Sequence, residues 1–165
     1  MIPKTIVDVT PKWLSNILGL EITDLGITKI GEGIGLLGDI YKVELIPDEH
    51  FPKSVVVKLP SSFENNRQQG VALGMFEAEV RFYNQLGPMI NVGLPKIYHA
   101  DIKDGTADFV IVMEDLSDLM MVSQSEGMSA LQAEAAVKVL AKIHSVWWGR
   151  MESHDFNWIP SMIGP

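Results

Sequence analysis

The sequence contains no cysteine. Disulfides, zinc sites built on thiolates and cysteine nucleophiles are therefore excluded. It also has no apolar run of about 18 residues, the length that a membrane-spanning helix needs, and no basic N-terminal segment followed by a long apolar one. These absences predict a soluble, cytoplasmic protein that does not associate with a membrane.

Basic residues are few, since 13 Lys and Arg stand against 21 Asp and Glu and give a net charge of −8. This balance argues against general binding of nucleic acids, which depends on basic surface. It is compatible with binding a nucleotide, because a few local cations and backbone N–H groups hold phosphates within an acidic protein. The chain of 165 residues, 47% of them hydrophobic, is long enough for a globular domain with its own core.

Glycines gather between residues 31 and 38, where Gly33, Gly35 and Gly38 have the spacing G-x-G-x-x-G. Glycines at this spacing let the backbone turn and approach a bulky anion without Cβ clashes. In a dinucleotide-binding fold they would open a helix. Residues 39–45 instead alternate between apolar and polar, which predicts a strand. The loop therefore joins two strands, as a phosphate-covering flap does, and the dinucleotide-binding fold is excluded.

Two charged residues interrupt apolar elements after this loop. Lys58 follows the β-branched run 55–57, which predicts a buried strand. At about 100° per residue, Glu79 lies within the apolar stripe of a helix predicted over 75–86, a stripe formed by Met75, Phe76, Phe82, Tyr83 and Leu86. A carboxylate on a buried face is costly unless a cation pairs with it, so Lys58 and Glu79 are predicted to form an ion pair. The alternative is that Glu79 leans to the edge of the stripe and reaches water, while Lys58 only ends its strand.

The remaining pattern predicts an α+β fold. We expect a short helix over 11–18, capped by Thr10 and ended by Gly19, and a longer helix from Ser129 to about Trp148. Strands are expected over 21–30, 39–46, 55–58, 96–100 and 108–113, with the helix 75–86 inserted after the third. Segment 61–74 is predicted to be a loop with a short helix, and a boundary is expected near 115–118.

In this order the motifs resemble those of the protein-kinase-like small-molecule phosphotransferases, which include aminoglycoside phosphotransferases, choline kinases and ecdysteroid-kinase-like proteins. The resemblance covers nearly the whole chain. It implies a kinase-like N-lobe over residues 1–116, a five-stranded antiparallel sheet with an inserted helix. Residues 117–165 would then hold the first helix of a truncated helical C-lobe, which residues 140–144 and Trp147-Trp148 resemble.

The resemblance also implies roles for individual residues. The nucleotide loop would comprise Gly33, Gly35, Gly38 and Ile40, and Lys58, held by Glu79, would orient the phosphates of ATP. The hinge, whose backbone would hydrogen-bond adenine, would comprise Met113, Glu114, Asp115 and Leu116. Val56 stands where protein kinases often have alanine against the adenine.

The family's chemistry needs a catalytic-loop aspartate and a later aspartate that binds Mg²⁺. Both are expected outside this chain, because the nearest candidate, His154-Asp155-Phe156-Asn157, lacks the required spacing. No catalytic residue and no metal ligand is therefore assigned here. His144 is expected to be packed or half-buried and to serve no catalytic role.

We therefore expect the nucleotide-binding portion of an ATP-dependent kinase for a small-molecule hydroxyl, inactive by itself. Two other classes stay open: a non-catalytic nucleotide sensor or interaction module with the N-lobe shape, and a domain that binds no nucleotide. The sequence does not identify the acceptor, since family membership alone does not fix a substrate. Apolar surface meant for the missing lobe, including Trp147 and Trp148, makes a homo-oligomer a further expectation.

Overall fold

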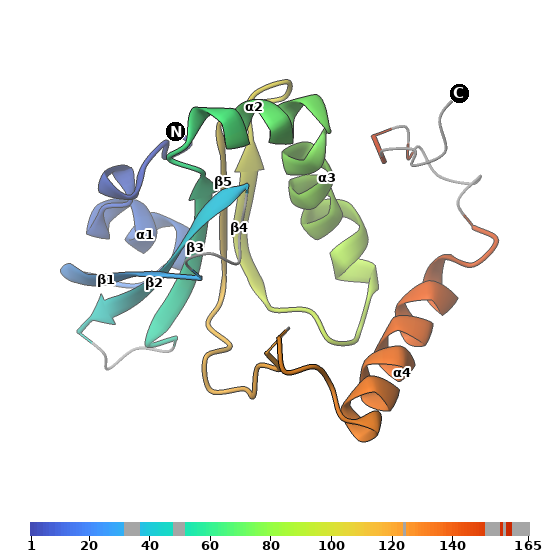
Figure 1. The fold of residues 1–165 in the computed structure, drawn as a ribbon. Helices are drawn as coiled ribbons and strands as arrows, with labels where there is room; N and C mark the ends of the chain where they lie inside the picture. Colours follow the sequence, from blue (N-terminus) through green and yellow to red (C-terminus); the bar gives the residue numbers. More distant parts are fainter. Residues whose placement is uncertain (32–36, 48–51, 124, 151–155, 157, 160–165) are drawn as a thin grey trace.

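The computed structural model describes residues 1–31, 37–47, 52–123, 125–150, 156 and 158–159. Its centre is a five-stranded antiparallel sheet with the order β1-β2-β3-β5-β4 (Figure 1). The strands are β1 (Asp24–Ile30), β2 (Gly38–Ile46), β3 (Ser54–Pro60), β4 (Ile97–Ile102) and β5 (Phe109–Glu114). The predicted α+β fold with five antiparallel strands is confirmed, although β1 begins three residues later than expected.

Two helices, not one, are inserted between β3 and β4. They are α2 (Glu64–Ala72) and α3 (Met75–Arg81), separated by a turn in which Gly74 has a φ of 64°. The predicted helix 75–86 is α-helical only as far as Arg81. It continues as a π-helical segment, Phe82–Leu86, and a 3-10 turn, Gly87–Met89. The prediction for residues 61–74, a loop with a short helix, underestimated the helix, since α2 fills most of that segment.

The ends of two other helices follow the predicted capping signals. In α1 (Pro11–Leu18) the Thr10 hydroxyl accepts a hydrogen bond from the Trp13 amide at 3.2 Å, and Gly19 ends the helix with a φ of 68°. In α4 (Ala130–Trp147) the Ser129 hydroxyl accepts from the Gln132 amide, and the Gln132 side chain accepts from the Ser129 amide. Side chains thus satisfy amides that a helix start leaves unpaired.

The two faces of the sheet pack against different helices, and α1 and α3 lie on opposite sides of it (Figure 1). On one face, α1 contributes Leu14 to a buried cluster with strand residues that include Val43, Leu45, Val55, Val57, Leu59, Val110 and Val112. On the other face, α3 contributes Phe76 and Val80 against Phe109 and Ile111 of β5. Successive strand residues point to opposite faces, so Lys58, between Val57 and Leu59, belongs to the α3 side.

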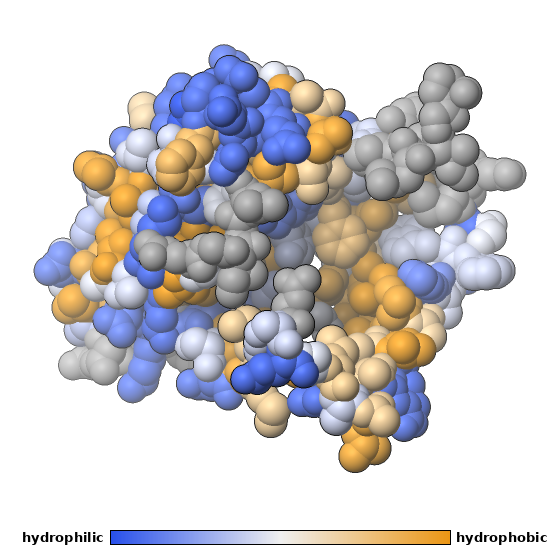
Figure 2. All heavy atoms as spheres, in the orientation of Figure 1, coloured by the Kyte–Doolittle hydropathy of each residue, from blue (hydrophilic) through white to orange (hydrophobic). Residues whose placement is uncertain are grey.

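Helix α4 lies apart from the sheet, and none of its residues is buried (Figure 1). Its Val139 approaches Gly93, where a Cβ would come within 2.8 Å of the valine methyl. Figure 2 shows apolar side chains gathered around a hollow between the sheet and this helix. No helix in the described part of the chain is long and apolar enough to cross a membrane.

Gly70 in α2 allows the stacked pair Phe76 and Phe109 to pack, so we predict that Gly70→Ala destabilises the protein. A Cβ at residue 70 would overlap the ring of Phe76, whose centroid lies 4.8 Å from that of Phe109. Alanine gains about 1 kcal/mol of helix propensity over glycine. Overpacking of a core costs about 1–3 kcal/mol, so the net change is expected to be unfavourable.

Urea unfolding of Gly70→Ala measures this change, with Gln69→Ala, an exposed position of the same helix, as the control. A variant at residue 70 that is more stable than the wild type would contradict the packing described here.

Candidate functional site

The predicted ion pair between Lys58 and Glu79 is present. Lys58 Nζ lies 2.7 Å from both carboxylate oxygens of Glu79. It joins β3 to α3 through two residues that are 21 positions apart in the sequence. The strand lysine and the helix glutamate are therefore brought together as the sequence predicted.

The pair is less buried than the helical pattern indicated. The side chains of Lys58 and Glu79 are 22% and 29% exposed. Within the predicted stripe Phe76 and Leu86 are buried, but Met75 is 45% exposed, so Glu79 lies at the edge of the packed surface. The alternative interpretation was thus correct that the carboxylate reaches water, although it also pairs with the lysine. For a pair this accessible we expect a contribution to stability of no more than about 1 kcal/mol.

Tyr83, one turn beyond Glu79 on the same side of the helix, is half-buried. Burial raises the pKa of its phenol, and the negative charge of Glu79 raises it further. The hydroxyl therefore remains protonated at neutral pH.

The sheet places apolar residues beside Lys58 on the α3 side. Ile40 of β2 and Ile111 of β5 pair with Lys58 across the two neighbouring strands. Two residues along β3, Val56 pairs with Lys42 and with Met113. Directly paired residues share a face, so Ile40, Val56 and Met113 form a half-buried apolar surface that is continuous with the lysine.

Gly38, the last glycine of the loop, lies against Lys58. A Cβ at this position would stand 3.1 Å from Lys58 Cε and 3.0 Å from the carbonyl oxygen of Leu59. The absence of a side chain at residue 38 therefore makes room for the lysine. Gly33 and Gly35, the other two glycines of the motif, lie outside the described residues.

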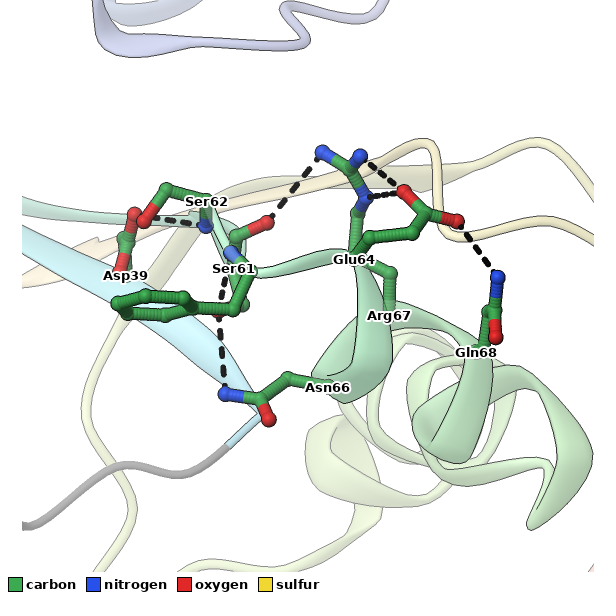
Figure 3. Close-up of polar contacts among 8 residues, drawn as sticks. Asp39, Ser61, Ser62, Glu64, Asn66, Arg67 and Gln68 are labelled. Atoms are coloured by element: carbon green, nitrogen blue, oxygen red, sulfur yellow. Dashed lines mark hydrogen bonds and ion pairs between the residues drawn. The ribbon is translucent and has the colours of Figure 1, made fainter.

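Asp39, immediately after the glycine loop, contacts two neighbouring elements, and Figure 3 shows its contact with Ser62. Its carboxylate accepts from the Ser62 amide at 3.1 Å and pairs with Lys29 Nζ of β1 at 3.1 Å. Next to it, the buried Ser61 hydroxyl accepts from the Asn66 side chain, and Arg67 donates to the Ser61 carbonyl. The entry of β2 is thus tied to β1 and to the start of α2.

Of the four predicted hinge residues, Glu114 and Asp115 are engaged on opposite sides. The Glu114 amide donates to the Lys96 carbonyl at 2.8 Å, and the Glu114 carboxylate accepts from the Lys96 amide at 3.0 Å. Asp115, by contrast, accepts from Ser54 Oγ of β3 at 2.6 Å and pairs with Lys42 Nζ of β2 at 3.0 Å. Met113 is the half-buried residue that pairs with Val56, and Leu116 is exposed.

Hydrogen bonding holds the Asp115 carboxylate in its charged form. Burial raises the pKa of this carboxyl, but hydrogen bonds from Ser54, Lys42 and Ser117 outweigh burial and lower the pKa well below its ordinary value. The hydrogen bond to Asp115 in turn raises the pKa of Lys42. Both groups are ionised throughout the neutral range.

Lys42, Ser54 and Asp39 were not among the predicted site residues. The alternation of β2 carries a signal for Lys42, because Lys42 must share a face with Ile40. No local pattern in the sequence links Ser54 to Asp115, which are 61 residues apart.

No group of three His, Asp or Glu side chains that would hold a metal ion occurs in the part of the chain that the structure describes. The prediction that His144 is packed or half-buried is wrong, because it is exposed on α4. His154, Asp155 and Asn157 lie outside the described residues. A cavity of about 420 Å³ lies between β4 and the segment after α3, and its lining includes Tyr83, Tyr98 and His99. Burial lowers the pKa of His99, whose ring meets Trp13 edge-on. None of the predicted site residues lines this cavity.

Comparison with protein families shows that the model of the Ecdysteroid kinase-like family matches residues 36–154. The aligned region includes Gly38, Lys58, Glu79 and the hinge, and it extends through α4. No curated protein matches the chain.

We predict that Asp115 contributes to stability in a pH-dependent way. Its folded-state pKa lies below the ordinary value of 3.8, so its contribution is complete above about pH 4 and is lost as the pH falls through the folded-state pKa. The difference in free energy of unfolding between the wild type and Asp115→Asn should be constant from about pH 7 to pH 5 and should shrink below about pH 4.

Urea unfolding at a series of pH values measures this difference. Asp118→Asn, which removes an exposed acid from the same loop, is the matched control. A difference that stays constant down to about pH 2 would show that the Asp115 carboxylate is not held in its charged form by its partners.

Proposed function

The chain belongs to the ecdysteroid kinase-like family, and from this membership we propose that it forms the ATP-binding part of a phosphotransferase acting on a small-molecule hydroxyl. The observation that carries the proposal is the Lys58–Glu79 pair beside the apolar surface of Ile40, Val56 and Met113. We assign residues 1–116 to the nucleotide-binding lobe and residues 117–165 to the beginning of the second lobe.

In this proposal the nucleotide lies on the α3 side of the sheet. Its base contacts Ile40, Val56 and Met113 and hydrogen-bonds to the backbone of residues 113–116. Its phosphates extend toward Lys58 beneath the loop that contains Gly33, Gly35 and Gly38. Phosphoryl transfer depends on positioning and electrostatic stabilisation, and a lysine held by a carboxylate supplies a cation at a fixed place.

Mg²⁺ accompanies ATP in kinases and neutralises charge on the phosphates. The described residues do not fit a Mg²⁺ site, because they include no cluster of three potential ligands, and Glu79 is already engaged by Lys58. Because His154-Asp155-Phe156-Asn157 lacks the spacing of the family's catalytic segment, we propose that the catalytic and metal-binding aspartates lie outside this chain and that the chain alone is inactive.

A second candidate function is a nucleotide sensor or interaction module without catalysis. The lack of a metal-ligand cluster in the described part of the chain favours this candidate as much as it favours an incomplete enzyme. Both candidates require nucleotide binding and differ only in whether phosphoryl transfer follows when catalytic residues are supplied.

We predict that the protein binds a non-hydrolysable ATP analogue and that Lys58→Ala weakens this binding about tenfold or more. A hydrogen bond to a charged group contributes about 1.5–3 kcal/mol, which is the basis of this figure. Calorimetric titration measures the affinity. Lys138→Ala is the control, since Lys138 is an exposed lysine on α4 paired only with Glu134 one turn away.

An affinity unchanged by Lys58→Ala would remove Lys58 from the site, and a wild type that binds no nucleotide would refute both candidates. Incubation with ATP, Mg²⁺ and a panel of aminoalcohols, followed by measurement of ADP, tests for inactivity. Robust turnover would show that the chain contains catalytic residues that we have assigned elsewhere.

Self-association is a further property that we propose for this chain. Exposed apolar residues continue from the segment after the hinge into α4, and they include Met120, Met121, Leu131, Leu140 and Trp148. Trp148 is 83% exposed, whereas Trp147 is half-buried and meets Phe156 edge-on. We expect light scattering to give a mass above that of the monomer, and a monomeric mass at high protein concentration would contradict this.

A further inference from the structure

The neighbouring acids Glu114 and Asp115 bind opposite parts of the sheet. Glu114 exchanges hydrogen bonds with Lys96 through both its amide and its carboxylate, and Lys96 immediately precedes the edge strand β4. Asp115 binds Ser54 at the start of β3 and Lys42 in β2. Glu114 therefore ties the end of β5 to the β4 side of the sheet, and Asp115, the next residue, ties it to β3 and β2 on the other side.

The attachment through Asp115 forms a closed ring. One carboxylate oxygen accepts from Ser54 Oγ at 2.6 Å and from Lys42 Nζ at 3.0 Å, and the other accepts from the Ser117 amide at 2.9 Å. Lys42 Nζ also donates to the Ser117 hydroxyl at 3.0 Å. The Asp115 side chain is only 8% exposed, so these protein donors occupy both of its oxygens away from solvent.

The contacts of Asp115 also fix Lys42, the second lysine beside the apolar surface on this face of the sheet. Lys42 shares the α3 side with Lys58, and each lysine has its own carboxylate: Glu79 for Lys58 and Asp115 for Lys42. Glu79 belongs to α3, whereas Asp115 lies at the hinge. The two lysines are thus held apart at opposite ends of the apolar surface made by Ile40, Val56 and Met113.

We propose that Glu114 and Asp115 are positioning residues that clamp the backbone of residues 113–116 between the two sides of the sheet and hold it in place for the base of the nucleotide. This inference rests on the proposed function for its ligand. The Asp115 carboxylate itself is not a ligand of the nucleotide or of a metal ion, because Ser54, Lys42 and Ser117 already engage it.

The physical effect of the clamp is preorganisation. Met113 and Glu114 are paired with β3 as part of β5, so the clamp matters most for residues 115–116, which leave the strand. A segment without regular backbone pairing loses conformational entropy when a ligand orders it. If side chains have already fixed that segment, binding no longer carries this cost. The clamp therefore acts on the affinity for the base and leaves the contacts of the phosphates with Lys58 unchanged.

The first measurement is amide hydrogen exchange of the free protein over residues 109–119. We expect exchange of this segment to be at least tenfold faster in Asp115→Asn than in the wild type and about threefold faster in the milder variant Ser54→Ala, which loses one donor. Glu126→Gln, an exposed acid farther along the chain, is the control and should leave the rate unchanged. Unchanged exchange in both clamp variants would overturn the clamp, whether or not the protein binds nucleotide.

The second measurement compares two ligands by calorimetry: a non-hydrolysable ATP analogue and inorganic tripolyphosphate. Asp115→Asn should weaken binding of the ATP analogue about tenfold, while its affinity for tripolyphosphate should stay within about twofold of that of the wild type. Ser54→Ala should weaken binding of the ATP analogue about threefold. Lys58→Ala should weaken both ligands. A merely structural role for Asp115 would weaken both ligands in Asp115→Asn as well.

The outcomes separate the two proposals. Faster exchange with unchanged affinity for the ATP analogue would overturn the positioning role while leaving the proposed function intact. A wild type that binds neither ligand would overturn the proposed function and the positioning role, and hydrogen exchange would still decide whether the clamp exists.

Discussion

The structure depends on the alternation of side chains along β3. Val55, Val57 and Leu59 point into the cluster that α1 covers, and this forces Lys58 to the opposite face, where α3 brings Glu79. A shift of one residue in the pairing of β3 would exchange the two faces and bury the lysine in the valine cluster. The register that builds the core therefore also builds the candidate site, so core and site cannot be specified separately.

Charge on this face is organised in two ion pairs that differ in burial: Lys58 and Glu79 are both partly exposed, whereas the Asp115 side chain is only 8% exposed. The Lys58–Glu79 pair contributes little to the free energy of unfolding, because water competes for both partners. Both pairs also orient the lysine side chains, because the flexible stem of a lysine lies along apolar surface while a carboxylate fixes the position of its ammonium group. Lys58 is drawn toward α3 and Lys42 toward Asp115, and Ile40, Val56 and Met113 on the same side of the sheet are half-buried.

The sequence predicted the features that depend on local chemistry. The caps of α1 and α4, the five strands and the pairing of Lys58 with Glu79 follow from Thr10, Ser129, the alternating strands and an acid in an apolar stripe. Helix α2 was underestimated because its only buried residue is Gly70, so it has no apolar periodicity to detect. The exposure of Glu79 and the Ser54–Asp115 bond depend on how distant elements meet, which no local pattern records. The nucleotide-binding roles assigned to all the site residues stay predictions, and Gly33 and Gly35 also lie outside the described residues.

Gly38 is constrained by packing within the protein. The space its missing side chain would fill is taken by the stem of Lys58 and by a carbonyl of β3, both of them protein atoms. The requirement for glycine at this position therefore comes from the protein's own packing and does not depend on a ligand. A bulkier residue at position 38 would first displace the stem of Lys58 and so change where its ammonium group lies. Any effect on a bound phosphate would follow from that displacement.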